Sequence, residues 1–299
     1  MQDHTFEKHV WAEIDLDALR SNFRVVRQQV GSLPLCAVVK ADSYGHGAVQ
    51  CARVLSEEGA AWFAVSCLAE AKQLRRSGIR QPILILGHVQ STYTAELIEY
   101  DLTAACYSTE QARSMNKAAV AAGSKVKVHL AADTGMGRIG FALRTDFQKA
   151  IDEMTAVCRL PGLAMTGMFQ HFAVADDTAP ENVAYTAEQY AYFIRAYQAL
   201  KAAGCEPPLL HCDNSAAVML HPDWPEGLPA DHCMARPGII LYGFDPSDEV
   251  RFGLFRPVMK LKTVVSMVKE MQPGQSTSYG RCFTAEKPTK VATLCTGYA

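Results

Sequence analysis

One stretch sets the fold of this chain: PLCAVVKADSYGHG, residues 34–47. Its first part, residues 34–39, is a run of apolar and β-branched side chains, which predicts a strand that is buried on both faces. Lys40 follows, then a polar turn rich in glycine, and then a helical pattern from about Ala48. A buried strand that leads through a turn into a helix is typical of an α/β fold.

Lys40 stands at the carboxyl end of that strand. Because burial disfavours the charged amine, we expect its pKa to lie below the ordinary value of about 10.4. A neutral amine is a nucleophile that forms a Schiff base with a carbonyl compound, pyridoxal phosphate included. The alternative is a lysine whose stem lies along the strand and whose ammonium group reaches water.

The composition is that of an ordinary globular protein, with 299 residues, 49% hydrophobic and 20% charged, and a formal net charge of -2. That length suffices for one large barrel domain and part of a second. The charge balance gives no support for nucleic acid or an anionic membrane as a partner. No apolar run reaches membrane-spanning length, and residues 1–10 are no signal peptide. The ten cysteines form no CxxC pair, which predicts a reduced, cytoplasmic protein.

Strand and helix patterns alternate at regular spacing after an amphipathic strand at residues 10–16. The predicted strands are 35–39, 62–65, 83–86, 103–106, 127–131, 164–169, 209–212 and 239–242. Eight strands that are mostly separated by helices predict an α/β fold, a (β/α)8 TIM-like barrel. The alternative is an open doubly wound sheet, but its Gly-x-Gly-x-x-Gly turn is absent after the first strand.

The pattern changes after Gly243. A turn cluster at residues 244–248 is followed by short segments of β character, 258–268, 277–279 and 291–294, of an antiparallel kind. We therefore predict a barrel domain over residues 1–243 and a β domain over 244–299, which the strand 10–16 can join. The sequence stops directly after a strand, so we expect this second domain to be incomplete.

The candidate site lies where the predicted strands end, because such barrels build their active sites at the carboxyl ends of the strands. The residues at or after those ends are Lys40, Tyr44, Leu86, Arg138, His171, Asn214 and Ser215, and Arg236, Gly238 and Ile239 lie around the predicted eighth strand. Loops after the seventh and eighth strands often hold phosphate in these barrels. A serine with free backbone amides at a helix start can bind an anion, although the same residues also serve as a plain helix cap.

Three histidines, His129, His171 and His211, fall in or after predicted strands. Their spacing fits no short metal motif, and no acidic residue accompanies them as in His-Glu-x-x-His. We therefore expect no metal site, and a metal-dependent barrel hydrolase is a remote alternative.

Several motifs resemble those of one enzyme family. Residues 37–47, AVVKADSYGHG, resemble the cofactor-lysine motif of the alanine racemases, which are pyridoxal-phosphate enzymes of fold type III. Further motifs follow in family order: WAEIDLD at 11–17, DTGMGRIG at 133–140, HFA at 171–173, NSAA at 214–217, RPGI at 236–239 and SYG at 278–280. Some of these motifs are weak singly, but the set is highly specific.

The resemblance implies a role for each residue. Lys40 would carry pyridoxal 5'-phosphate and act as one acid/base, and Tyr279 would act as the second, from the other subunit of a head-to-tail homodimer. Arg236 would face the pyridine nitrogen with His171 as its brace, and Arg138 would contact the phenolic oxygen and the substrate carboxylate. The further residues implied at the cofactor are Tyr44, Leu86, Asn214, Ser215, Gly238 and Ile239.

The chemistry agrees with these roles, because racemisation needs two bases on opposite sides of a planar intermediate. An arginine does not readily give a proton to the pyridine nitrogen, which favours racemisation over transamination or decarboxylation. The predicted function is the interconversion of L- and D-alanine, a small amino-acid substrate, for cell-wall peptidoglycan. A broad-specificity or serine racemase and a non-catalytic pyridoxal-phosphate-binding barrel are the alternatives.

Two features depart from the family pattern. Ala131 stands where many members have a lysine that becomes carbamylated and orients the arginine, so Arg138 needs another means of positioning, and strict specificity for alanine stays open. The chain also ends within the second domain, from which we expect weak or absent activity and impaired dimerisation.

Overall fold

The computed structural model describes residues 9–221 and 226–297. The chain divides into two compact units. The barrel unit comprises Leu16–Val258, and the β unit joins the residues up to Asp15 with those from Met259 onward. The barrel unit thus extends beyond the predicted end at residue 243. It does so because the side chain of Asn22 holds the later loop, accepting from Arg256 N (2.8 Å) and donating to Arg256 O (2.8 Å).

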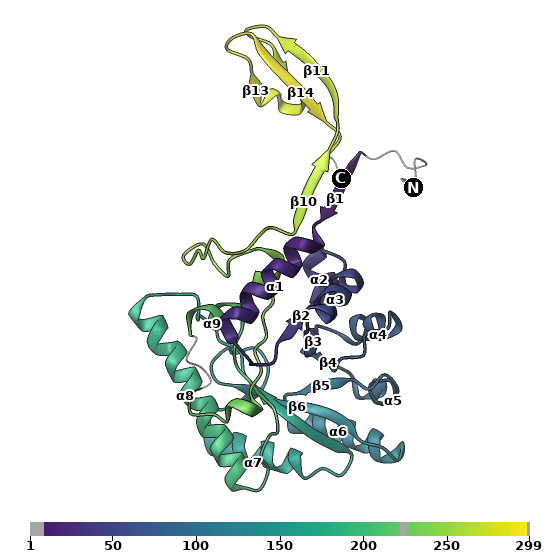
Figure 1. The fold of residues 1–299 in the computed structure, drawn as a ribbon, viewed down its shortest axis with the longest axis vertical. Coiled ribbons are helices and arrows are strands. Elements are labelled where there is room, and N and C mark those ends of the chain that lie inside the picture. Colours follow the sequence, from purple (N-terminus) through teal and green to yellow (C-terminus); the bar gives the residue numbers. More distant parts are fainter. Residues whose placement is uncertain (1–8, 222–225, 298–299) are drawn as a thin grey trace. The chain divides into compact units, whose positions relative to one another are not determined.

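A parallel sheet forms the centre of the barrel unit, with the strand order β2-β3-β4-β5-β6-β8-β9 (Figure 1). Its strands are β2 (Cys36–Val38), β3 (Trp62–Val65), β4 (Ile83–Ile85), β5 (Thr103–Cys106), β6 (Val126–Asp133), β8 (Leu163–Phe169) and β9 (Leu210–His211). A short strand, β7 (Phe141–Ala142), pairs with the end of β6. The observed strands overlap the predicted ones, and the predicted α/β, TIM-like class is confirmed.

The predicted eighth strand, residues 239–242, is wrong. Those residues form a 3-10 helix, η3 (Ile239–Tyr242), and the segment 233–237 takes the expected place. It bridges Leu210 through Cys233 and Leu35 through Ala235, both in parallel. A short apolar run does not distinguish a strand from a buried helical turn by periodicity, which explains the error.

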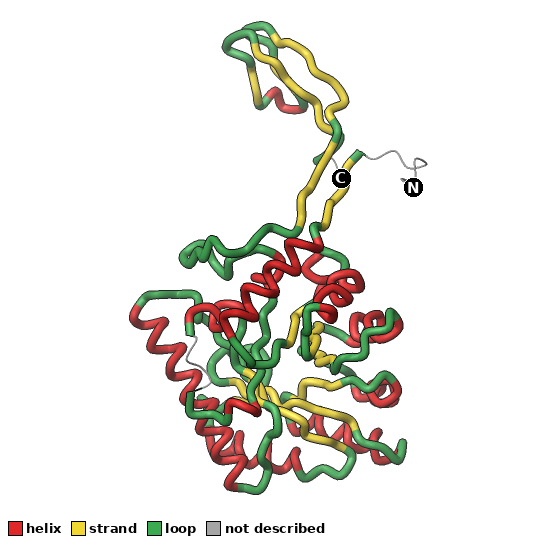
Figure 2. Tube along the Cα trace, viewed as in Figure 1, coloured by secondary structure: helices red, strands yellow, loops and turns green. Residues whose placement is uncertain are grey.

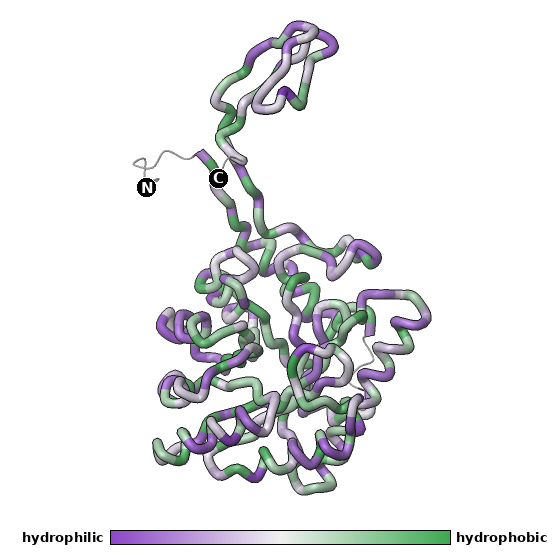
Figure 3. The backbone as a smooth tube through the Cα atoms, turned by 180° about the vertical axis from the view of Figure 1, so that it is seen from behind, coloured by the Kyte–Doolittle hydropathy of each residue, from purple (hydrophilic) through white to green (hydrophobic). Residues whose placement is uncertain are grey.

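Helices surround this sheet on its outer side (Figures 1 and 2). They are α1 (Leu16–Val30), α3 (Ala48–Glu57), α4 (Leu68–Arg76), α5 (Thr94–Glu99), α6 (Thr109–Ala121), α7 (Phe147–Cys158), α8 (Pro180–Ala202) and α9 (Ser215–Leu220), with short 3-10 turns η1 (Ser91–Tyr93) and η2 (Ala230–His232). Hydrophobic and hydrophilic residues share these helices (Figure 3). In α1, for example, Leu19, Phe23 and Val26 are fully or almost fully buried, at the spacing of one helix face.

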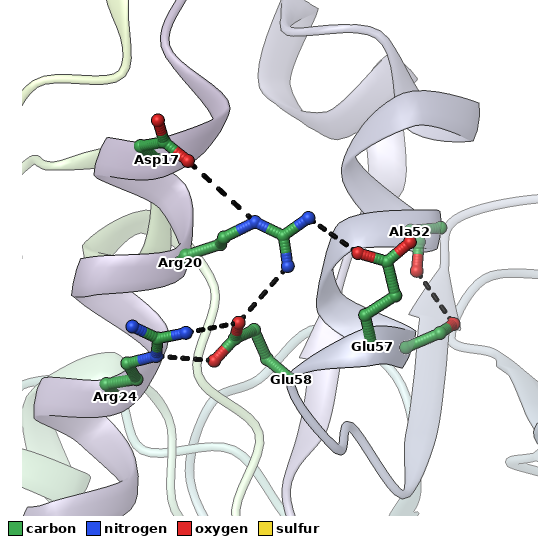
Figure 4. Close-up of polar contacts among 7 residues, drawn as sticks. Asp17, Arg20, Arg24, Ala52, Glu57 and Glu58 are labelled. Atoms are coloured by element: carbon green, nitrogen blue, oxygen red, sulfur yellow. Dashed lines mark hydrogen bonds and ion pairs between the residues drawn. The ribbon is translucent and has the colours of Figure 1, made fainter.

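A network of charges joins α1 to the end of α3 (Figure 4). Arg20 contacts Glu57 at 2.5 Å and Glu58 at 3.1 Å. Arg24 makes a two-point contact with Glu58, at 2.7 and 2.8 Å. Bidentate contacts of this kind add geometric specificity, and the network links α1 to the end of the helix that follows the lysine turn.

The β unit consists of paired antiparallel strands, as predicted. The strand β1 (Val10–Ile14) pairs with β10 (Met259–Thr263), β11 (Val265–Met271) with β14 (Thr289–Leu294), and β12 (Ser276–Thr277) with β13 (Phe283–Thr284). A 3-10 turn, η4 (Tyr279–Arg281), lies between β12 and β13. Among the helices that the structure describes, none has the length and apolarity needed to cross a membrane.

Candidate functional site

The turn after β2, labelled α2 (Lys40–Gly45), has an unusual backbone. Four consecutive residues, Ala41, Asp42, Ser43 and Tyr44, have φ values of 51°, 52°, 56° and 53°. This left-handed conformation costs roughly 1–2 kcal/mol for each residue other than glycine. The sequence predicted a turn here but not its hand. Such strain persists only where surrounding contacts determine the backbone, and it is concentrated at functional sites.

Hydrogen bonds hold this turn at both ends. Ser43 N donates to Val39 O at 3.0 Å, and Gly47 N donates to Asp42 O at 2.9 Å. The Asp42 carboxylate accepts from Ala48 N at 2.7 Å, at the start of α3. The turn is therefore tied both to the strand before it and to the helix after it.

Lys40 lies in the wall of a cavity of about 530 Å³ at the carboxyl ends of the barrel strands. Its Nζ is 5.6 Å from the centroid of the Tyr44 ring. Burial lowers the pKa of Lys40, the positive charge of Arg138 lowers it further, and Glu70 acts in the opposite direction. The expected direction of the pKa shift is therefore found at this lysine.

The other residues predicted from the strand ends line the same cavity: Tyr44, Leu86, Arg138, His171, Asn214, Ser215, Arg236, Gly238 and Ile239. Tyr279 is in the β unit, in η4, with its side chain 87% exposed. The barrel unit thus brings together every predicted site residue that it contains.

A group of hydrogen-bonding atoms gathers around Gly238. Its backbone N donates to Ser215 Oγ at 2.9 Å, and a Cβ at this position would lie 2.6 Å from the Tyr44 hydroxyl oxygen. Burial raises the pKa of Tyr44 to about 12, so its hydroxyl keeps its proton. Asn214 caps α9, accepting from Ala217 N at 3.0 Å, and donates to Phe172 O at 3.3 Å. The hydroxyls and amides here could hold an anion such as a phosphate.

Arg236 is buried, 4% exposed, and both its Nη atoms are engaged. Nη1 donates to the Nδ1 and the carbonyl oxygen of His211, at 2.8 and 2.5 Å. Nη2 donates to Gln170 O at 2.6 Å and to Cys212 O at 3.4 Å. The brace of Arg236 is therefore His211 with three carbonyls, and the prediction that His171 holds this arginine is corrected.

His211 continues inward to His129, with 2.8 Å between His211 Nε2 and His129 Nδ1. Because an arginine only donates, His211 Nδ1 accepts, and the proton of His211 is on Nε2. Burial and then the charge of Arg236 lower the pKa of His129 to about 3 and that of His211 well below its ordinary value. Both rings are thus neutral at physiological pH.

His171 also lines the cavity. Burial lowers its pKa to about 3, with smaller contributions from Arg236, Arg138 and Lys40. It is therefore a neutral hydrogen-bonding group among three cations.

Arg138 lies exposed at the rim of the cavity, in the turn after β6. The carboxylate of Asp133 shapes this turn by accepting from Gly135 N and Gly137 N, both at 3.0 Å. Ala131 is buried against Ala105 and Phe169, with Tyr107 and Leu86 packed beside them. Apolar and aromatic side chains thus surround the position where a family lysine would stand.

Other residues of the site were missed by the sequence reasoning. Asp176, His88 and Phe169 line the cavity, and Tyr107 hydrogen-bonds His88. Phe169 ends one predicted strand and His88 lies two residues after another, and this position is a signal that could have identified both. Within the residues described, no group of three or more His, Cys, Asp or Glu side chains could hold a metal ion.

Comparison with known proteins gives consistent matches. The family description "Alanine racemase, N-terminal domain" matches residues 14–246, and "Alanine racemase, C-terminal domain" matches 258–299. The alanine racemase of Desulforamulus reducens is 42% identical over 293 residues, which cover 97% of this chain and 76% of the relative.

Solved structures agree with the sequence relatives. An alanine racemase of Clostridium difficile 630 superposes with a TM-score of 0.85 at 36% identity, covering 97% of this chain and 73% of that chain. A histidine racemase of Leuconostoc mesenteroides has a TM-score of 0.82 at 29% identity, with 96% and 74% covered.

Proposed function

Because the chain belongs to the alanine racemase family, we propose that it interconverts L- and D-alanine with pyridoxal 5'-phosphate held at the mouth of the barrel. One observation carries the proposal. A single cavity brings together a lysine of lowered pKa, a buried arginine and a set of hydroxyls and backbone amides. The reaction class is that of an isomerase.

The residues of the cavity fit this cofactor. Tyr44, Ser215 and the backbone of Gly238 and Ile239 would hold its phosphate. Because Gly238 has no Cβ, the Tyr44 hydroxyl can lie beside it without a clash. Arg236 would meet the pyridine nitrogen, and Leu86 would pack against the ring. When bound, the cofactor supplies an electrophilic carbonyl and an electron-withdrawing ring, which make the α-proton of an amino acid more acidic.

Lys40 would bind the cofactor covalently and then act as one acid/base. Its lowered pKa increases the fraction of neutral amine, the form able to accept a proton. The left-handed turn limits the directions in which this side chain can enter the cavity. We assign the second acid/base to Tyr279, supplied by a second copy of the chain in a homodimer. Its 87% exposed side chain is accessible for such a role.

Arg236 favours racemisation over other reactions of the same cofactor. Its Nη atoms are occupied by His211 and backbone carbonyls, which leaves Nε–H as the donor for the ring nitrogen. Since the guanidinium does not release its proton, that nitrogen would stay unprotonated. This argues against a decarboxylase, and the β unit with Tyr279 argues against a carrier without activity, because a carrier needs no second base.

Arg138 at the rim would bind the substrate carboxylate, and the small side chains of Ala131 and Ala132 line the same cavity. Alanine is the first proposed substrate. A broader specificity, with serine included, is the second candidate, favoured by alanine in place of a lysine at position 131. We further propose that the enzyme works in the cytoplasm and supplies D-alanine for peptidoglycan.

The proposal is tested by incubating the cofactor-loaded protein with L- or D-alanine and following optical rotation, with serine and histidine as comparison substrates. Rotation should decay to zero from either enantiomer of alanine. Lys40→Ala should lose the visible absorbance band of the bound cofactor and at least about 10³-fold in rate, because it removes a nucleophile and a base together. The exposed Lys125→Ala is the control. An unchanged rotation with wild-type protein would contradict the proposed activity.

A further inference from the structure

Glu70 lies in the first turn of α4, outside the cavity wall, yet its carboxylate reaches the lysine turn. One oxygen, Oε1, accepts from Ala41 N at 2.8 Å. The other, Oε2, accepts from Ser66 N at 2.7 Å and from Ser66 Oγ at 2.9 Å. One side chain therefore links the residue after Lys40 to the residue after β3.

The geometry of Ser66 leaves little freedom at this link. Ser66 follows β3 directly and lines the cavity. A Cβ on Gly87, which follows β4, would lie 2.3 Å from the carbonyl oxygen of Ser66. The end of β3 is thus held closely between its neighbours, and Glu70 connects it to the neighbouring strand end at β2.

Ala41 is where this connection matters most. It is the first of the four residues in the left-handed conformation, with a φ of 51°. A strained turn keeps its conformation only while its contacts hold it, and a hydrogen bond to a charged acceptor is stronger than a neutral one. Since Ala41 directly follows Lys40, the bond to Glu70 restricts the backbone from which the lysine side chain departs.

Glu70 also contributes charge. The groups around the amine of Lys40 are Arg138, the neutral His171 and the protonated Tyr44, with Arg236 deeper in the cavity. Burial and Arg138 lower the pKa of Lys40, whereas Glu70 raises it. Glu70 is therefore a counter-charge to the cations on this side of the site.

We propose that Glu70 is a positioning residue for Lys40, which ties the amide after the lysine to the end of β3 and balances the positive charge around the amine. The inference goes beyond the proposed racemisation and rests on it only for the role of Lys40. Glu70 touches neither substrate nor cofactor in this assignment, and it acts through the turn.

The experiment measures Lys40 itself in protein from which the cofactor has been removed with hydroxylamine. Acetic anhydride acetylates neutral amines, so the acetylation rate of Lys40, read by peptide mass spectrometry, gives its titration midpoint. Glu70→Gln should move this midpoint to lower pH by about 0.5–1 pH unit, because it removes a nearby negative charge. Glu70→Asp keeps the charge and should leave the midpoint near that of the wild type, and the exposed Glu99→Gln should change nothing.

A second readout follows the geometry. In the cofactor-loaded protein, Glu70→Gln should lower kcat for alanine about 10-fold or more with little change in KM, and Glu70→Asp should recover part of that loss. A midpoint that is equal in all variants, or that falls as far in Glu70→Asp as in Glu70→Gln, overturns the proposal and leaves Glu70 as a simple link between elements. The midpoint is measured without substrate, so failure of the proposed racemisation would appear separately, as a wild-type protein that does not change optical rotation.

Discussion

The two units of this chain differ in how they bury apolar side chains. The barrel unit encloses residues such as Leu19, Phe63 and Phe193 at 0% exposure. In the β unit, Leu261 and Val268 are 70% and 61% exposed. Small pairs of strands rarely bury enough surface for stability on their own. The comparison indicates that the barrel unit builds its own core, while the β unit leaves apolar side chains and Tyr279 exposed. A second copy of the chain is the partner we propose.

The largest effect that tests this comparison is expected at Tyr279. If the β unit supplies the second base, Tyr279→Phe should lower racemisation about 10²–10⁴-fold, the usual contribution of a general acid or base. Exchange of the α-proton with D2O should persist for the one enantiomer whose proton faces Lys40. Tyr93→Phe, at an exposed tyrosine of the barrel unit, is the matched control. Equal and small effects of both substitutions would remove the β unit from the chemistry.

A matched pair of leucines tests burial directly. Leu19→Ala in α1 should lower the free energy of unfolding by about 2–5 kcal/mol, because it leaves a cavity in a closed core. Leu261→Ala in β10 should change it by no more than about 0.5 kcal/mol, as at other exposed sites. Denaturant unfolding of both variants at several protein concentrations gives the values. A cost at Leu261 that grows with protein concentration would instead identify this strand as part of the interface between two copies.

The same contrast shows what could be predicted from the sequence. Buried parallel strands consist of apolar runs, and the residues after them must meet at one edge of the sheet. That rule predicts that Lys40 and Arg138 meet in one cavity, whereas Arg236 precedes the predicted strand 239–242 and its place at the cofactor was implied by the family resemblance. Apolar and polar residues alternate less clearly along the exposed strands of the β unit, but the antiparallel character of these strands was still predicted.

The structural features that the sequence did not predict depend on contacts between residues far apart in the chain. The left-handed turn at Ala41 is held by Glu70, which lies in another helix. No local sequence pattern predicts this contact. Residues 239–242 have the apolar composition of a strand, yet residues 233–237 occupy the position predicted for that strand and bridge Leu35 and Leu210. The brace of Arg236 is His211 because both lie at adjoining positions in the barrel, whereas the family resemblance pointed to His171.

Lowering the pH is expected to reduce the free energy of unfolding by a smaller amount, through buried histidines of the barrel unit. His129 and His211 are buried and neutral, and the pKa of His129 is lowered to about 3. An unfolded chain takes up protons as pH falls through about 6.5, while these folded rings do not until much lower pH. Their contribution to stability is thus complete above pH 6.5 and is lost progressively below it. Between pH 6.5 and 5.5 we expect a loss of about 1–2 kcal/mol.

Denaturant unfolding at the two pH values measures that loss, and a histidine variant assigns it. His129→Asn removes one buried ring, so its unfolding free energy should depend less on pH than that of the wild type, whatever its absolute stability. His232→Asn, at a ring that is more exposed, is the control variant. The slope is the decisive quantity, because lost packing lowers stability equally at both pH values, whereas a buried titrating group alone makes the loss depend on pH. A wild-type slope in His129→Asn would mean that other groups of the barrel unit cause its acid sensitivity.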